Sequence, residues 1–306
     1  MESEKPLHAI ALMGATGTGK SALAMAVARG TDSSIICCDS MQLYRGLDIG
    51  TAKPTQAERE EVLHFLVDCC TLPDLYSAAR WAKEARVVIK AENEQGRRPL
   101  IVGGTGFYLK ALLEGFAEVP EDKPGVRERY DSIHRESGTL ALYEELAQRD
   151  PVMAGRLKAN DTQRIMRALC VLESSGVSLA AWQAKAAAEH EIVDCPLFVL
   201  DVERELLRER LAARFHHMMQ QGWLDEVQWL MGLKLNDTHP AMRAVGYRQL
   251  MDCLSGLITL EQAKIDAVTA TRRYAKRQVT WFNNQTPDAV HGSAESLQEK
   301  IMGLFP

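Results

Sequence analysis

A glycine-rich octapeptide near the start of the chain has the composition and spacing of a phosphate-binding loop. It follows a short apolar run and matches the pattern G-x-x-x-x-G-K-S at every fixed position. The glycines let backbone N–H groups point at phosphate oxygens, the lysine reaches the outer phosphates, and the serine can ligate Mg²⁺. A glycine-rich turn that matches by chance is the alternative. The predicted diphosphate or nucleotide site, with Ser21 as metal ligand, comprises Gly14, Ala15, Thr16, Gly17, Thr18, Gly19, Lys20 and Ser21.

The second acidic residue of an ATP-using phosphate loop is not evident in the sequence. Such a residue normally holds Mg²⁺ from the end of a neighbouring buried strand. The strand expected at residues 99–102 ends in Gly-Gly-Thr and supplies no carboxylate, which leaves Asp39 and Asp68 as candidates at strand ends. The loop alone therefore leaves open whether the phosphates are transferred, hydrolysed or only held.

The elements around this loop predict an α/β fold, a P-loop NTPase-like parallel sheet covered by helices. Apolar runs separated by helical segments, with glycines just after strands, are typical of such a sheet. From residue 119 the pattern becomes helical, and strand-like residues return near 195. We expect residues 1–118 and 196–306 to form the core with C-terminal helices, and residues 119–195 to form a helical insertion. Strands are predicted at residues 8–13, 34–38, 64–68, 99–102 and 195–200.

Composition and charge limit the class of protein. The chain of 306 residues is 46% hydrophobic and 25% charged, and its first residues do not resemble a signal peptide. No apolar run reaches the roughly 18 residues of a membrane helix. Seven cysteines without a C-x-x-C pair indicate reduced thiols and no zinc site. We expect a cytoplasmic, monomeric protein with no membrane contact.

The net charge of −5 does not indicate a nucleic-acid partner. Any such partner must be met by a local basic patch. Residues 272–277 provide a candidate, because four of these six residues are basic and none is acidic.

Four stretches of the sequence together resemble the bacterial tRNA dimethylallyltransferase family. They are the phosphate loop, residues 38–54 (Cys-Asp-Ser-Met-Gln-Leu-Tyr-Arg-Gly-Leu-Asp-Ile-Gly-Thr-Ala-Lys-Pro), residues 102–108 (Val-Gly-Gly-Thr-Gly-Phe-Tyr) and residues 276–282 (Lys-Arg-Gln-Val-Thr-Trp-Phe). The resemblance runs from about residue 8 to 282. The C-terminal zinc finger of eukaryotic relatives has no counterpart, as is expected for the bacterial branch.

The resemblance implies a reaction that explains the missing acid. Family members move the dimethylallyl group of dimethylallyl diphosphate onto N6 of the adenosine 3′ adjacent to the anticodon, in tRNAs that read codons beginning with U. A carbon is attacked and the diphosphate leaves, so the loop needs only to bind two phosphates, with Mg²⁺, as charge develops. The implied partners are dimethylallyl diphosphate and the anticodon stem-loop of tRNA, with the insertion binding the RNA.

The resemblance also implies catalytic roles for four side chains. Asp39 is the expected general base, since the adenine amine loses a proton as the C–N bond forms. Thr105 is expected near the reacting groups, and Lys20 and Arg214 are expected to hold the diphosphate. Asp39 could instead cap a turn, Thr105 could only form a turn, and Arg214 could lie on a solvated helix surface.

Several segments resemble the family's RNA contacts. The enzyme must extrude a stacked base, so contacts to the flipped base, phosphate contacts and aromatic stacking are needed. Each arginine could equally be ordinary helix surface, and Trp281 could be core. Residues 50–54 fit a turn, and the sequence assigns them no role. The predicted RNA contacts are Asp39, Ser40, Met41, Gln42, Thr105, Arg127, Gln163, Arg164, Ile165, Met166, Arg167, Arg243, Ala244, Val245, Gly246, Tyr247, Arg248, Lys276, Arg277, Gln278, Val279, Thr280, Trp281, Phe282 and Asn283.

Two other functions fit parts of the sequence. A small P-loop kinase would use Asp39 to activate a hydroxyl group and would need ATP but no RNA. A nucleotide-dependent RNA-binding protein would form no covalent product.

Overall fold

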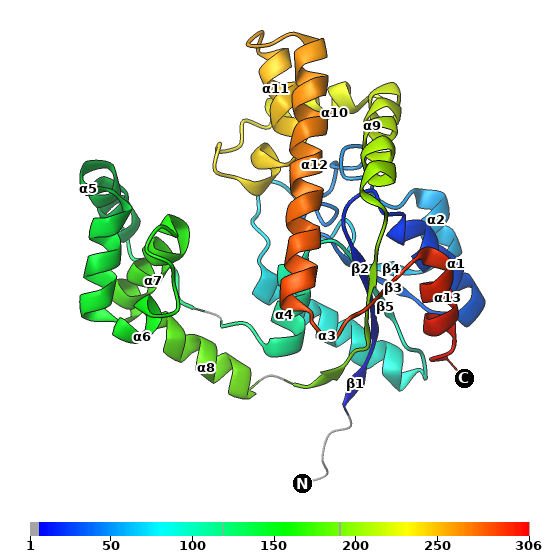
Figure 1. The fold of residues 1–306 in the computed structure, drawn as a ribbon, viewed down its shortest axis with the longest axis horizontal. Coiled ribbons are helices and arrows are strands. Elements are labelled where there is room, and N and C mark those ends of the chain that lie inside the picture. The colour runs from blue at the N-terminus through cyan, green and yellow to red at the C-terminus, as the bar shows by residue number, and fades with distance from the viewer. Residues whose placement is uncertain (1–5, 118, 190, 306) are drawn as a thin grey trace. The chain divides into compact units, whose positions relative to one another are not determined.

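The chain forms two compact units. The computed structural model describes residues 6–117, 119–189 and 191–305. One unit comprises Met1–Leu113 and Ile192–Pro306, and the other comprises Glu114–Glu191 (Figure 1). The second unit begins and ends slightly before the predicted insertion of residues 119–195. The cause at its end is strand β6, Val193–Asp194, which pairs with β1, Leu7–His8, in the first unit.

The first unit is built on a parallel sheet of six strands. Their order is β4-β3-β5-β2-β7-β8, and each pairing is parallel, which confirms the predicted α/β fold. Because neighbouring strands run the same way, the loops after β2, β3, β5 and β7 meet at one edge of the sheet. The strands are β2 Ile10–Gly14, β3 Ile35–Cys38, β4 His64–Phe65, β5 Leu100–Gly103, β7 Leu197–Leu200 and β8 Val290–Gly292.

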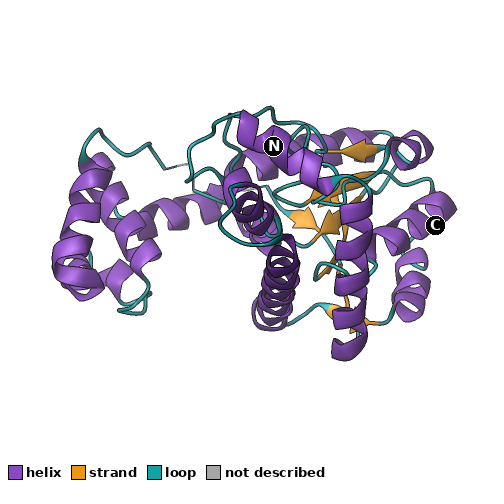
Figure 2. Cartoon of the chain, turned by 90° about the horizontal axis from the view of Figure 1, so that it is seen from above, coloured by secondary structure: helices purple, strands orange, loops and turns teal. Residues whose placement is uncertain are grey.

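Helices cover both faces of this sheet, and Figure 2 shows them on either side of the strands. The pleat explains why: along β2, Ala11 and Met13 join one hydrophobic cluster while Ile10 and Leu12 join the other. Every residue of β2 is therefore buried. The helices of this unit are α1 Lys20–Thr31, α2 Gln56–Glu61, α3 Ala78–Glu94, α4 Gly106–Glu114, α9 Arg204–Gln220, α10 Trp223–Gly232, α11 Tyr247–Leu254, α12 Leu260–Gln285 and α13 Ala294–Met302, with a 3₁₀ turn at Pro240–Arg243.

The second unit is helical and has its own core. Its helices are α5 Val126–Arg149, α6 Pro151–Ala154, α7 Thr162–Ser175 and α8 Leu179–Glu189. Tyr130, Leu142 and Leu169 are fully buried among them. Helix α5 runs across a kink at Gly138, whose φ of 77° is open mainly to glycine.

No single helix in the described part of the chain is long and apolar enough to cross a membrane. Only by length and composition, the bent pair Thr162–Ser175 and Leu179–Ala188 is together long and apolar enough for such a span.

Candidate active site

A cavity of about 1220 Å³ lies in the first unit at the carboxyl ends of the parallel strands. The phosphate loop, the turn after β3, the Asp48–Lys53 loop, α9 and α12 contribute to its walls. It thus brings together segments from distant parts of the sequence. The predicted site residues that line it are Thr16, Gly17, Gly19, Lys20, Ser21, Asp39, Ser40, Met41, Gln42, Arg214, Arg243, Ala244, Val245, Tyr247, Arg277 and Gln278.

The phosphate loop has the backbone geometry of an anion site. Gly17 and Gly19 have φ values of 82° and 96°, which L side chains rarely adopt. Gly19 is the N-cap of α1 and provides no side-chain cap, so the first amides of α1 keep their donor capacity at the positive end of the helix dipole. The Thr18 hydroxyl closes the turn by donating to the Ala15 carbonyl at 2.9 Å.

Two distant side chains anchor this loop. Gln278 of α12 accepts a hydrogen bond from the Thr16 amide at 2.9 Å and donates to the Gly104 carbonyl at 2.8 Å. Nη1 of Arg210 donates to the Thr18 carbonyl at 3.1 Å. The Thr16 amide is therefore already used. Both polar ends of Gln278, a predicted RNA contact, are bonded within the protein.

Lys20 is a cation without a protein counter-ion in the loop. Its Nζ lies 3.4 Å from the Ala15 carbonyl oxygen, and no described carboxylate lies within ion-pairing distance. Burial lowers the pKa of Lys20 to about 8, although the charge of Asp39 acts in the opposite direction, and the Arg214 charge adds to the lowering. A bound anion would relieve this unfavourable environment.

Asp39 is held in the turn that follows β3. Its Oδ1 accepts from the Met41 amide at 2.9 Å, so the expected turn-forming role is real for one carboxylate oxygen. The neighbouring Ser40 amide donates to Oγ1 of Thr105 at 3.1 Å, and the Thr105 amide donates to the Cys38 carbonyl at 3.1 Å. Thr105, which follows the adjacent strand β5, thereby fixes the position of the Asp39 turn.

Gln42 and Arg214 both contact the backbone of the Asp48–Lys53 loop. Nε2 of Gln42 donates to the carbonyls of Thr51 and Ala52, each at 3.1 Å, while its Oε1 accepts from the Cys37 thiol at 3.2 Å. Nη2 of Arg214 donates to the Thr51 carbonyl at 3.5 Å. Burial lowers the pKa of Arg214, and the charge of Asp39 opposes that change.

The remaining predicted residues of the first unit divide into buried and exposed groups. Tyr247 is buried, and its hydroxyl donates to Oε1 of Glu226 at 2.5 Å. The predicted residues Ala244, Gly246 and Phe282 are also buried, and Trp281 is half-buried where its ring packs on Gly106. Exposed side chains are those of Arg243, Arg248, Lys276, Arg277, Val279, Thr280 and Asn283.

The predicted RNA contacts of the second unit show the same division. Ile165 and Met166 belong to its core, whereas Gln163 is exposed. Arg127 and Arg164 are exposed on α5 and α7, with Arg127 3.7 Å from Asp131 and Arg164 3.5 Å from Asp161. Arg167 is half-exposed and pairs with Asp122 at 2.8 Å, so part of its capacity is used within the unit.

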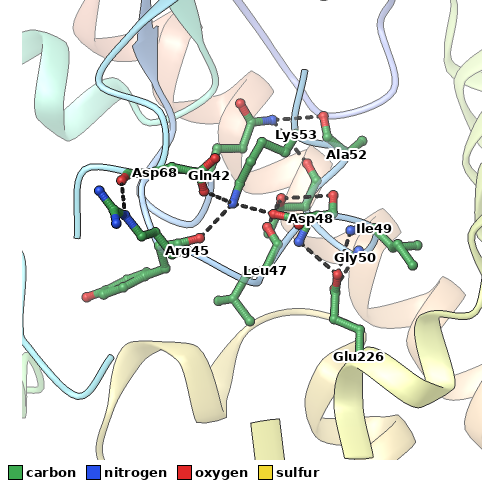
Figure 3. Close-up of polar contacts among 12 residues, drawn as sticks. Gln42, Arg45, Leu47, Asp48, Ile49, Gly50, Ala52, Lys53, Asp68 and Glu226 are labelled. Carbon is green, nitrogen blue, oxygen red and sulfur yellow. Dashed lines mark hydrogen bonds and ion pairs between the residues drawn. The ribbon is translucent and has the colours of Figure 1, made fainter. Parts of the chain in front are cut away.

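Several residues that line or support the cavity are not among the predicted site residues. Tyr274 of α12 lines it, and burial raises the pKa of its hydroxyl, helped by the charge of Asp39. Lys53 and Glu226 shape its wall through the network of Figure 3. A lysine inside a Gly-Thr-Ala-Lys-Pro turn was the available signal, but no local pattern marks Glu226, which lies on α10.

A magnesium ion fits the site only when phosphates are present. The described residues contain no group of three His, Cys, Asp or Glu side chains that could hold a metal. Ser21 is exposed at the start of α1 and can offer one oxygen. Mg²⁺ commonly keeps water and takes substrate phosphates as ligands, so this single hydroxyl is compatible with it.

Comparisons with known proteins point to one family. The family model for IPP transferase matches residues 42–285. A tRNA dimethylallyltransferase of Azorhizobium caulinodans is 41% identical over 305 residues, covering 99% of this chain and 97% of the relative. The crystal structure of a Bacillus halodurans tRNA isopentenylpyrophosphate transferase is 30% identical with a TM-score of 0.71, and covers 97% of this chain and 95% of its own.

A eukaryotic dimethylallyltransferase acting on tRNA extends the comparison. It is 25% identical with a TM-score of 0.78, covering 94% of this chain and 74% of its own. The fold and the loop define a P-loop α/β protein. Because the family model and the relatives span most of the chain, the protein belongs to the IPP transferase family.

Proposed function

We propose that the protein transfers the dimethylallyl group from dimethylallyl diphosphate to N6 of the adenosine 3′ adjacent to the anticodon, in tRNAs that read codons beginning with U. The observation that carries this proposal is one cavity in which Lys20, Arg214 and the open N-terminus of α1 lie near the carboxylate of Asp39. Such a site has groups for an anionic leaving group and a proton acceptor for a nucleophile.

The chemistry assigns each group a role. N6 of adenosine attacks the allylic carbon, the C–O bond breaks, and the electron pair leaves with the diphosphate. Lys20, Arg214 and the amides of the phosphate loop stabilise the charge on the departing oxygens. Asp39 accepts the N6 proton, and Thr105 positions Asp39 through the Ser40 amide.

Magnesium is proposed as the cofactor. When bound, Mg²⁺ would neutralise charge on the diphosphate as a Lewis acid, and Ser21 would be its protein ligand. The amides at the start of α1 remain the protein's own contribution to binding the phosphates.

The RNA is proposed to be held by the exposed basic side chains of both units. Arg243, Arg248, Lys276 and Arg277 are exposed on the first unit, and Arg127 and Arg164 on the second. Phosphate contacts of this kind supply affinity and make it depend on salt. The segments that contain buried residues, such as Ile165 and Met166, would act by placing these arginines. We propose that residues 119–195 serve as this RNA-binding insertion, and that the protein acts as a cytoplasmic monomer.

The kinase alternative lacks support. A kinase needs a carboxylate for its metal beside the phosphate loop, and β5 is followed by Gly104 and Thr105 instead. None of the three proteins compared above is named as a kinase.

The direct test supplies dimethylallyl diphosphate labelled in the carbon chain together with unmodified tRNA. We expect label on one adenosine beside the anticodon, with no requirement for ATP. Product formation that needs ATP but not RNA would favour the kinase. RNA binding that changes with ATP and yields no covalent product would favour a nucleotide-dependent RNA-binding protein.

An Asp39→Ala variant tests the proposed base. Turnover should fall by about 10²–10⁴-fold, the usual contribution of a positioned general base, while tRNA affinity changes little. Single-turnover rates and tRNA binding would be measured on the same preparation. Comparable losses in both quantities would argue against the base role.

A further inference from the structure

We propose that Glu226 and Lys53 are positioning residues that hold the Asp48–Lys53 loop, so that its carbonyls orient Gln42 and Arg214 in the active-site cavity. The loop is the part of the cavity wall to which the sequence assigned no role. This inference rests on the proposed function for its kinetic effect. Its structural part can be measured independently.

Glu226 accepts hydrogen bonds from three consecutive backbone amides. Its Oε2 accepts from the amides of Asp48 at 2.8 Å and Ile49 at 2.7 Å, and its Oε1 accepts from Gly50 at 3.0 Å (Figure 3). Oε1 also accepts from the Tyr247 hydroxyl. One carboxylate from α10 thus determines the path of three consecutive residues. Gly50 must lack a side chain here, because a Cβ would meet the Trp223 ring.

Lys53 fixes the other end of the loop. Its Nζ is almost fully buried and donates to the Tyr44 carbonyl at 2.7 Å, to Oδ1 of Asp48 at 2.6 Å and to Oδ1 of Asp68 at 2.6 Å (Figure 3). All three hydrogens of the ammonium group are therefore used. Asp68 is itself held by Arg59 at 2.6 Å.

The two carbonyls between these anchors face Gln42, a predicted RNA contact, and Arg214. Thr51 and Ala52 together accept both amide hydrogens of Gln42, and Thr51 also accepts from Arg214. An amide whose nitrogen is fixed in this way must present its oxygen on the opposite side. Oε1 of Gln42 takes the Cys37 thiol as one donor there, and an amide oxygen can accept a second. The loop thereby selects which end of Gln42 is offered to a substrate.

Stability alone does not explain this arrangement. Burying the Lys53 ammonium group costs desolvation, and apolar residues of similar volume often stabilise a protein as well as a buried ion pair does. A loop fixed by ionic and hydrogen-bonding groups gains a single defined backbone path instead. That is what precise placement of two substrate-binding side chains requires.

The test is a double-mutant cycle between Glu226→Gln and Gln42→Ala. Glutamine keeps the size of Glu226 but must turn an NH₂ group toward either the Asp48 and Ile49 amides or the Gly50 amide. We expect kcat/KM to fall about tenfold in Glu226→Gln, and the further loss that Glu226→Gln causes in the Gln42→Ala background to be clearly smaller than tenfold, because the two residues are coupled through one backbone segment.

Glu92→Gln provides the matched control. Glu92 is a buried carboxylate that accepts from Ser34 at 2.6 Å and from Arg97 at 2.9 Å, and it does not line the cavity. Its effects and those of Gln42→Ala should multiply independently. A multiplicative result for the Glu226 pair as well, or equal kinetic losses in Glu226→Gln and Glu92→Gln, would overturn the inference.

A readout without catalysis separates this inference from the proposed function. In the full-length protein, Glu226→Gln should speed hydrogen exchange of the amides of residues 48–50 and shift the side-chain amide NMR signals of Gln42. An unchanged Gln42 signal would overturn the positioning role. Inactivity of the wild-type protein toward tRNA and dimethylallyl diphosphate would overturn the proposed function and leave this structural result in force.

Discussion

Two groups of backbone amides lie on the wall of the same cavity, and they differ in whether a protein carboxylate accepts their hydrogen bonds. The amides at the start of α1 have no side-chain cap, and Lys20 beside them has no ion-pair partner among the described residues. The amides of Asp48, Ile49 and Gly50 donate hydrogen bonds to the carboxylate of Glu226. The neighbouring Lys53 is paired with both Asp48 and Asp68.

The difference separates a site for a substrate from a structural site. Inward-pointing amides occur in both places, so they do not identify a phosphate site by themselves. The charge balance does: the phosphate loop has uncompensated positive charge, and burial lowers the pKa of Lys20 to about 8. The second loop is already neutralised by the protein's own groups. Substitutions at Lys20 and Lys53 should therefore have opposite consequences.

Replacing Lys20 with methionine should give the largest effect on activity. We expect kcat/KM for dimethylallyl diphosphate to fall by about 10²–10³-fold, as when one electrostatic group of a transition state is lost. Stability should rise, because a lowered pKa means that the charged lysine destabilises the fold below pH 8. Steady-state kinetics and thermal unfolding at pH 7 would measure both. An unchanged KM and rate would refute the assignment.

Replacing Lys53 with methionine should have the opposite effect on stability. The Tyr44 carbonyl and the carboxylates of Asp48 and Asp68 lose their buried donor, so the free energy of unfolding should drop by about 2–3 kcal/mol. Urea unfolding at pH 7 would measure the change beside Lys20→Met. A variant as stable as the wild type would contradict the contrast between the two lysines.

The pH dependence of donor binding should follow Lys20. Since the pKa of Lys20 is about 8 in the free protein, the ammonium group is lost above that pH. KM for dimethylallyl diphosphate should then rise by up to about tenfold per pH unit. Lys20→Arg keeps its charge and should remove this rise. A flat wild-type profile between pH 7 and pH 9.5 would exclude the role of this titration.

Low pH should weaken the anchoring of the Asp48–Lys53 loop, with a smaller effect on stability than the Lys53 substitution. Burial raises the pKa of Asp68, but hydrogen bonds from Lys53 and Arg59 outweigh it, and the pKa is lowered overall. The stability that Asp68 contributes is thus complete above its unfolded pKa near 3.8 and is lost as the pH falls through the lower folded value. Asp68→Asn should lose less stability than the wild type between pH 5 and pH 3. Urea unfolding at each pH would measure the change, and an equal loss of unfolding free energy in the variant and the wild type would contradict this.

The phosphate loop could be predicted because its information is local. Eight consecutive residues contain the glycines, the lysine and the serine, and the strand and helix that flank them follow from apolar patterning. Long helices such as α7 and α12 are predictable from sequence for the same reason. The parallel sheet followed from repeated apolar runs, although its edge strand β8 is not among the predicted strands.

The rest depends on contacts between distant residues. Asp39 and Thr105 are close because β3 and β5 are neighbours, which strand spacing does not reveal. Gln278 binds Thr16 across 262 positions, and Glu226 binds the Ile49 amide across 177. Patterning also did not separate surface arginines from core residues within the RNA-like segments, where Ile165 is buried beside Arg164.

The central claim is that the phosphate loop holds a leaving group, and the fate of one oxygen tests it most directly. Dimethylallyl diphosphate would carry oxygen-18 at the atom that joins the carbon chain to phosphorus, and the products with tRNA would be analysed by mass spectrometry. Cleavage of the C–O bond predicts that all of the label is found in free diphosphate and that the RNA gains only the carbon chain. Label retained in a released alcohol, or a phosphate attached to the RNA, would contradict the account.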